Sequence, residues 1–204
     1  MADQLVQPER VVLASSSPQR KALLRQIGID PVCVAADIDE SRLDGESAAD
    51  YVQRLAVGKC QTVRSLHPDT VVIGADTTIS VGRHILGKAT DFHEAKETLS
   101  LLSGTQHSVF TGVCIANASA QKQQVCETKV EFCPLSAAQI RSYWESGEPQ
   151  GKAGCYAIQG LGSVFVKSIH GSYSNVVGLP VHEVSLLLRD FGIKVLNLSV
   201  KRSD

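Results

Sequence analysis

Two short apolar runs, at residues 11–14 and 71–75, restrict the folds that this chain of 204 residues can adopt. Both runs are rich in valine and give way at once to polar residues, a pattern typical of strands buried inside a sheet. Segments with the periodicity of amphipathic helices lie between and after them. Because strands and helices interleave without a strict βαβ rhythm, the sequence predicts an α/β or α+β fold with a mixed sheet flanked by helices.

Boundary signals place several of these elements. Ser17 can cap a helix that has Pro18 in its first turn and Gly28 just past its end. Asp91 can cap another helix, which ends at Gly104. Apolar stripes predict further helices over residues 47–66, 136–146 and 180–191. Strands are predicted over residues 107–116, 125–133 and 162–170, and over 77–81 leading into a hairpin through Gly82.

Composition indicates one ordinary folded unit. Lysine plus arginine (20) and aspartate plus glutamate (21) nearly cancel, and this net charge of −1 argues against a nucleic acid or an anionic membrane as partner. No apolar run approaches the roughly 18 to 20 residues of a membrane span, and the amino terminus does not resemble a signal peptide, so we expect a cytoplasmic protein. With no repeat or long linker, we expect a single domain over residues 11–193 between tails at residues 1–10 and 194–204.

The stretch from Ser15 to Arg20 predicts an anion site. A strand leads into a serine cluster and a proline-led helix, so several backbone N–H groups and the positive end of the helix dipole face one point. The hydroxyls of Ser15 and Ser17 add donors, and Arg20 can form a charge-assisted fork to phosphate. The competing interpretation is an ordinary capped helix with a surface arginine.

Two further charges stand in unusual places. Lys59 lies on the apolar stripe of its helix, four residues after Leu55 and four before Val63, so it either snorkels to the surface or points into a polar cleft. Asp76 is expected to end the strand at 71–75, where a carboxylate can bind a divalent metal, act as a general base or simply begin a turn.

Glu40 and Lys88, each in a short polar turn, complete a set of carboxylates and cations suited to a metal–phosphate substrate. The known phosphate-binding loops, the nucleophile elbow and histidine pairs of metalloenzymes are absent from the sequence. The six cysteines lack C-x-x-C spacing and are expected to be reduced thiols.

Taken together, these motifs resemble the Maf family of nucleoside triphosphate pyrophosphatases. The resemblance spans about residues 11 to 192 in order. The matching segments are Leu13-Ala14-Ser15-Ser16-Ser17-Pro18-x-Arg20, Asp39-Glu40, Arg54-Leu55-Ala56-x-x-Lys59, Gly74-Ala75-Asp76-Thr77, Leu86-Gly87-Lys88, Leu102-Ser103-Gly104, Tyr156-x-Ile158-Gln159-Gly160 and Gly171-Ser172-Tyr173-Ser174-Asn175-Val176-Val177-Gly178-Leu179-Pro180.

The resemblance implies an elongated α/β fold of two lobes with a central cleft, related to the inosine triphosphate pyrophosphatases, and a homodimer. It also implies hydrolysis of a nucleoside triphosphate to the monophosphate and pyrophosphate with Mg²⁺ or Mn²⁺, a house-cleaning activity. By the same resemblance, Asp76 is the catalytic aspartate and a metal ligand with Glu40. Phosphate binding falls to Ser15, Arg20, Lys59 and Lys88, to which the helix geometry adds Ser17.

With Thr77 and Gln159 at these two positions, the chain resembles the branch of the family that acts on dTTP and UTP. At residue 19 the family usually has an arginine, at a position associated with substrate choice, and this chain has Gln19, which lacks the charge and the planar fork. One alternative is therefore the same reaction on other nucleotides, such as 7-methyl-GTP, pseudo-UTP, 5-methyl-UTP or CTP. A second alternative is a nucleotide-binding regulator of cell division with little turnover.

Overall fold

The computed structural model describes residues 11–82 and 84–195. The predicted amino-terminal tail and all but the first two residues of the predicted carboxy-terminal tail lie outside the described residues. Seven strands form a single sheet in the order β2-β1-β3-β5-β6-β7, with β4 paired to β3. They are β1 (Val11–Leu13), β2 (Val32–Cys33), β3 (Val71–Val81), β4 (His84–Leu86), β5 (Gln106–Ala116), β6 (Gln121–Phe132) and β7 (Val166–His170).

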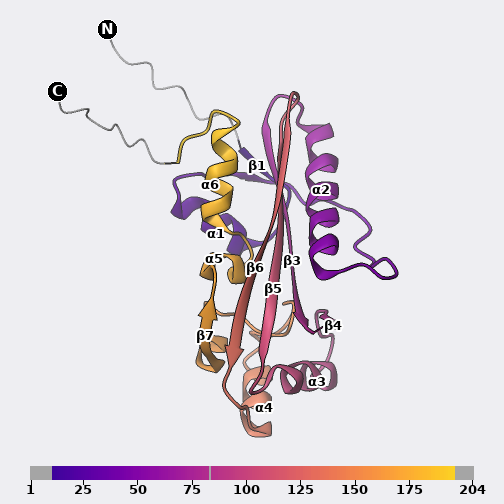
Figure 1. Cartoon of the computed structure of the whole chain (residues 1–204), viewed down its shortest axis with the longest axis vertical. Coiled ribbons are helices and arrows are strands. Elements are labelled where there is room, and N and C mark those ends of the chain that lie inside the picture. Colours follow the sequence, from indigo (N-terminus) through magenta and orange to yellow (C-terminus); the bar gives the residue numbers. More distant parts are fainter. Residues whose placement is uncertain (1–10, 83, 196–204) are drawn as a thin grey trace, which may run out of the picture.

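The sheet is mixed, as predicted. β1 lies parallel to both β2 and β3, whereas all other pairs are antiparallel. Asp76 of β3 is opposite Gly112 of β5 in this register. The three long strands β3, β5 and β6 run along the long axis of the molecule and give it an elongated shape (Figure 1).

Helices cover both faces of the sheet and one end of it (Figure 1). They are α1 (Pro18–Gln26), α2 (Ala48–Leu66), α3 (Phe92–Leu102), α4 (Ala137–Glu145), α5 (Tyr173–Val177) and α6 (Val181–Arg189), with a 3₁₀ helix, η1 (Leu161–Phe165). The side chains of β3 alternate between faces, so Val71 and Ile73 pack with α1 and α6 while Val72 packs with α2. A third cluster of buried side chains joins α3 and α4 to the far end of the sheet.

Two glycines let α2 lie directly on the sheet. A Cβ added to Gly74 of β3 would lie under 3.0 Å from the carbonyl oxygen of Ala56 and the amide of Cys60. At Gly112 of β5 it would be equally close to the backbone of Val52. Because side chains are missing at these two points, the helix backbone approaches the strands closely, and one turn of α2 comes to face the middle of β3.

The prediction that a strand ends at Asp76 is wrong. β3 continues without a break from Val71 to Val81, and Asp76 lies at its centre. The β-branched residues Thr77, Thr78 and Ile79 extend the strand because β5 offers a paired partner to each of them.

The predicted strand over 162–170 is also wrong in its first part, which forms η1, and β7 begins only at Val166. The strand predicted from residue 125 begins four residues earlier, because polar residues pair with the end of β5 in a hairpin. Within the described part of the chain, no helix is both long and apolar enough to cross a membrane.

Candidate active site

A single cleft of about 770 Å³ collects the charged and hydroxyl side chains that the sequence indicated. It lies against the middle of β3 and is bordered by the start of α1, by α2 and by the segments around residues 88, 151 and 177. All the predicted site residues line it: Ser15, Ser17, Gln19, Arg20, Glu40, Lys59, Asp76, Thr77, Lys88 and Gln159.

Lys59 lies between two carboxylates at the base of this cleft. Its Nζ is 2.6 Å from Oδ1 of Asp76 and 2.6 Å from Oε1 of Glu40. Lys59 and Asp76 are each 8% exposed, so the lysine does not snorkel to the surface but points into the polar cleft. Burial of these charges is tolerated because each has an opposite charge in hydrogen-bond contact.

Glu40 is ionised in this arrangement. Partial burial raises the pKa of Glu40, but the hydrogen bond and the positive charge of Lys59, with smaller effects from Lys88 and Arg20, bring it below its ordinary value. Glu40 is therefore a carboxylate at neutral pH, as is required of a group that binds a cation.

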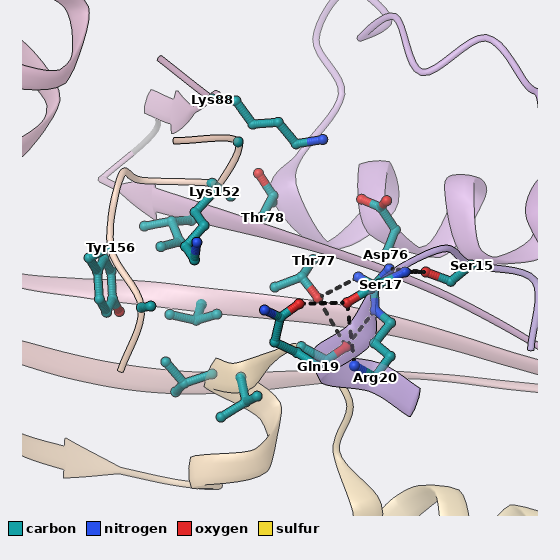
Figure 2. A pocket seen from close by; sticks show the side chains of 18 of the residues that line it. Ser15, Ser17, Gln19, Arg20, Asp76, Thr77, Thr78, Lys88, Lys152 and Tyr156 are labelled. Atoms are coloured by element: carbon teal, nitrogen blue, oxygen red, sulfur yellow. Dashed lines mark hydrogen bonds between the residues drawn. The ribbon is translucent and has the colours of Figure 1, made fainter. Parts of the chain in front are cut away.

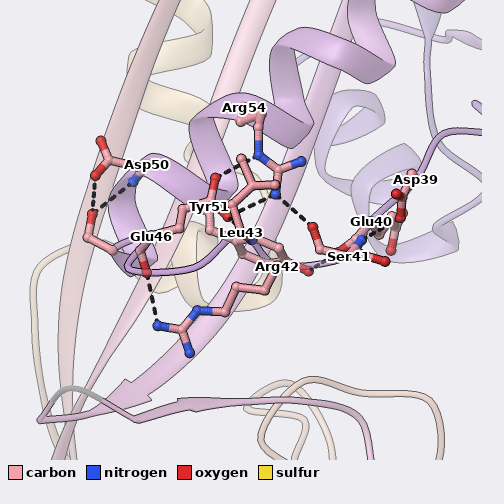
Figure 3. A network of polar contacts seen from close by, with 10 residues as sticks. Asp39, Glu40, Ser41, Arg42, Leu43, Glu46, Asp50, Tyr51 and Arg54 are labelled. Atoms are coloured by element: carbon pink, nitrogen blue, oxygen red, sulfur yellow. Dashed lines mark hydrogen bonds and ion pairs between the residues drawn. The ribbon is translucent and has the colours of Figure 1, made fainter.

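The loop that carries Glu40 is fastened to α2 (Figure 3). Tyr51 donates a hydrogen bond from its hydroxyl to the carbonyl oxygen of Glu40 at 3.0 Å. Arg54 makes a two-pronged contact with Glu46, at 2.6 and 2.8 Å, and also binds the carbonyl oxygen of Ser41. Since Lys59 belongs to the same helix, one element positions both the lysine and its exposed carboxylate partner.

The start of α1 uses its serines partly as caps. Ser17 accepts the amide of Arg20 at 3.3 Å and donates to Oε1 of Gln19 at 3.2 Å. Ser15 accepts the amide of Ser17 at 3.1 Å. The helix start, to which Gln19 belongs, thus faces the cleft as predicted (Figure 2).

Arg20 binds other parts of the protein through three of its nitrogens. Nε donates to the carbonyl oxygen of Gly178 at 2.8 Å, Nη1 to Ser15 and Nη2 to Oγ1 of Thr77 at 3.1 Å. Burial lowers the pKa of Arg20, and the charges of Asp76 and Glu40 oppose that shift. Arg20 therefore connects α1, β3 and the segment after α5, a role that the sequence did not suggest.

The rest of the cleft was not recognised from the sequence. Its apolar part is lined by Ile79, Val109, Tyr156, Ala157, Val176 and Val177. Lys152 and Tyr156 lie on one side of the cleft, and Asp76, Ser15 and Ser17 on the other (Figure 2). Since these wall residues follow no periodic pattern of their own, only the fold brings them together.

The carboxylate pair fits the expected divalent cation. The contacts with Lys59 use one oxygen of each carboxylate, Oε1 of Glu40 and Oδ1 of Asp76. In residues 11–82 and 84–195, no three His, Cys, Asp or Glu side chains are arranged to hold a metal ion. Mg²⁺ commonly takes only one or two carboxylates and completes its shell with water and substrate phosphates. The donor set therefore suits Mg²⁺ or Mn²⁺ bound together with a phosphate group.

Comparison with known proteins identifies the family. Residues 10–191 match the family model described as Maf-like protein. The dTTP/UTP pyrophosphatase of Hahella chejuensis is 48% identical over 189 residues, which cover 91% of this chain and 94% of that protein. The proteins of the same name from Sphingopyxis alaskensis and Acinetobacter baylyi are 49% and 45% identical, covering 90% and 87% of this chain and 97% of each relative. The chain belongs to the Maf family.

Proposed function

We propose that this protein hydrolyses a nucleoside triphosphate at the α-phosphorus to the monophosphate and pyrophosphate, with dTTP and UTP as preferred substrates. The observation that carries the proposal is the contact of Lys59 with both Glu40 and Asp76 in a cleft that also has an apolar wall. The charged part suits a metal-bound triphosphate, and the apolar part suits a nucleobase. The names of the three relatives support this substrate class.

In this proposal, the phosphates bind at the start of α1 and between the lysines. The hydroxyl of Ser15 would donate a hydrogen bond, that of Ser17 would do so in exchange for its bond to Oε1 of Gln19, and Arg20 contributes positive charge beside them. Lys88 is exposed and its ammonium group extends toward Asp76 (Figure 2), where it can neutralise the departing pyrophosphate. Lys59 stabilises the same charge while it keeps the two carboxylates together.

Asp76 and Glu40 would hold the divalent cation, which when bound neutralises phosphate charge and lowers the pKa of a coordinated water. We propose that Asp76 also accepts a hydrogen bond from the attacking water and so directs it at the α-phosphorus. Thr77 and Gln159 would contact the base. Gln19 lies near Thr77 (Figure 2) and can contribute an amide to base selection.

Replacement of Asp76 by Asn tests the catalytic role. Turnover is expected to fall by about 100- to 10,000-fold, because the amide can neither accept a proton nor bind the cation as a carboxylate does. Pyrophosphate release, measured as phosphate with malachite green after adding inorganic pyrophosphatase, gives the rate. Asp190→Asn, at an exposed surface ion pair, is the matched control and should retain wild-type activity. A wild-type rate in Asp76→Asn would refute the assignment.

The same assay on a panel of nucleotides, with Mg²⁺ or Mn²⁺, distinguishes the alternatives. Preferred turnover of dTTP and UTP supports the proposal, whereas preference for 7-methyl-GTP or another modified nucleotide assigns the same machinery to a different base. Binding without turnover would favour a regulator of cell division. We also propose a cytoplasmic homodimer, for which sedimentation velocity and cell fractionation are the direct measurements.

A further inference from the structure

The carboxylate of Glu148 lies outside the lining of the cleft and accepts three hydrogen bonds. Oε1 accepts from the hydroxyl of Tyr143 at 2.7 Å and from the amide of Gly162 at 2.9 Å, and Oε2 accepts from the amide of Leu161 at 2.8 Å. Partial burial raises the pKa of Glu148, but these bonds bring it below its ordinary value. Such a set of bonds to one half-buried carboxylate in a turn indicates a defined positional role.

Two of the three donors belong to the first turn of η1. The first amides of a helix have no partner within the helix, and Gly160 at the cap position has no side chain to accept from them. Glu148 supplies the missing acceptor from a loop more than ten residues earlier. A Cβ at Gly160 would collide with this carboxylate, so the turn is fitted closely around it.

Tyr143 links Glu148 to Ala157, which lies just before the first turn of η1. Its hydroxyl donates to Glu148 and accepts the amide of Ala157 at 3.0 Å. Its ring packs edge-on against Phe165, with centroids 4.9 Å apart. Glu148 and Tyr143 therefore hold both ends of the segment 157–162, and Gln159 lies between the two fixed ends.

This segment forms one wall of the cleft. Tyr156, Ala157 and Gln159 line it, next to the apolar side chains of Ile79 and Val109. The wall lies on the side of Tyr156, away from Asp76 and the serines of α1 (Figure 2). If the charged side takes the triphosphate, the base lies against this wall.

We propose that Glu148 is a positioning residue that fixes the wall at 156–160 and thereby determines which nucleobase the cleft accepts. The proposal rests on the proposed nucleoside triphosphate substrate. In this proposal, two parts of the cleft are held in place by different elements. α2 positions the catalytic carboxylates, and Glu148 positions the wall at 156–160.

Replacement of Glu148 by Gln is the test. The amide nitrogen of glutamine cannot accept a hydrogen bond. If it replaces Oε2, the amide of Leu161 loses its acceptor; if it replaces Oε1, both the amide of Gly162 and the hydroxyl of Tyr143 lose theirs. KM for the preferred nucleotide is expected to rise about tenfold while kcat stays within about twofold, because at least one hydrogen bond and the negative charge are lost away from the reacting atoms. Selectivity among nucleotides should weaken as well. The inhibition constant of inorganic tripolyphosphate, which has no base, should stay at the wild-type value.

Tyr143→Phe provides a second variant, which removes only the hydroxyl and keeps the ring against Phe165. It should shift KM and selectivity in the same direction as Glu148→Gln. Glu131→Gln is the matched control, because Glu131 binds exposed Lys167 and Ser168 outside the cleft. Its KM and selectivity should equal those of the wild type.

Two results would overturn the positioning role. One is a nucleotide profile of Glu148→Gln identical to that of the wild type, and the other is an equal loss of affinity for nucleotide and tripolyphosphate. If the wild type hydrolyses no nucleoside triphosphate, the proposed function fails instead. Calorimetry of nucleotide and tripolyphosphate binding to the wild type and to Glu148→Gln then still tests the positioning role of Glu148, because a binding measurement needs no turnover.

Discussion

Lys59 shows how a single residue can reveal a site before the fold is known. A lysine on the apolar stripe of a helix must either reach the solvent or meet an opposite charge. Here it meets two, at 2.6 Å each. With one cation between two anions the trio carries a net charge of −1, so it repels free phosphate less than a bare carboxylate pair would and still attracts a divalent cation.

Glu40 gives this trio a measurable pH dependence. Partial burial raises the pKa of Glu40, but Lys59 and its neighbours lower it overall. A carboxyl group whose pKa is lower in the folded state stabilises the fold above its unfolded-state pKa, and this contribution disappears as the pH falls through the folded-state pKa. The difference in melting temperature between the wild type and Glu40→Gln should therefore be constant near neutral pH and shrink below pH 4.5. Melting curves across the acid range check this, and a gap that widens in acid would contradict it.

Arg20 marks a limit of inference from local sequence. Its position in the first helical turn suggested a fork to phosphate, and it does line the cleft. Three of its nitrogens nevertheless bind protein groups, including Gly178, which is 158 residues away in the chain. A partner at that separation leaves no trace in the sequence around residue 20.

At the scale of elements, the packing of α2 on β3 and β5 positions the proposed catalytic groups. Lys59 lies on the helix and Asp76 on the strand, and their separation depends on how closely the two backbones approach. Gly74 and Gly112 set that approach, because a methyl group at either one would collide with the backbone of α2. The glycines are conformationally ordinary here, and what matters is the absence of a side chain.

Replacement of Gly74 by Ala should separate α2 from β3. Backbone atoms of the helix cannot move aside as a flexible side chain can, so the free energy of unfolding should fall by about 1 to 3 kcal/mol. Turnover should fall with it, because Lys59 moves away from Asp76. Urea unfolding and the pyrophosphate assay measure the two effects.

Gly58→Ala is the matched control within α2. An added methyl group there meets only the end of the Ile38 side chain, at 3.2 Å. Alanine also favours the helix interior, so this variant should be as stable as the wild type or more so. Equal free energies of unfolding for Gly74→Ala and Gly58→Ala would show that the stability of the fold does not depend on the close approach of α2 to β3.

β3 explains why the sequence predicted a strand end at Asp76, a residue that lines the cleft from the middle of the strand. The change from apolar to polar residues after Ala75 looked like a strand end. In the structure the strand continues through Thr77 and Thr78, since β5 pairs with every residue from Val72 to Ser80 and the cleft lies over the middle of the sheet. Polar residues within a central strand can be recognised as part of the strand only when the neighbouring strand that pairs with them is known.

At the scale of the whole molecule, the cleft draws on residues from Ser15 to Gly178. The mixed sheet, most helices and the charged cleft residues Arg20, Glu40, Lys59, Asp76 and Lys88 could be predicted, because periodicity, caps and misplaced charges are local signals. The short elements β2 and α5, the 3₁₀ helix η1 and the apolar wall could not. Glu148 illustrates the reason: its partners lie in an irregular segment, and a carboxylate in a turn otherwise predicts only exposure to solvent.

The long strands have a consequence for how a ligand enters. β3 and β5 contribute side chains to all three clusters of buried side chains, β6 contributes to the cluster with α3 and α4, and the pairing of the three strands is continuous along the cleft. A hinge between the two ends of the molecule would have to break that pairing. The part of the cleft that lies on the sheet is therefore set in place during folding, and association should proceed as the docking of a ligand onto a prepared surface, with little ordering of the strands left to oppose it.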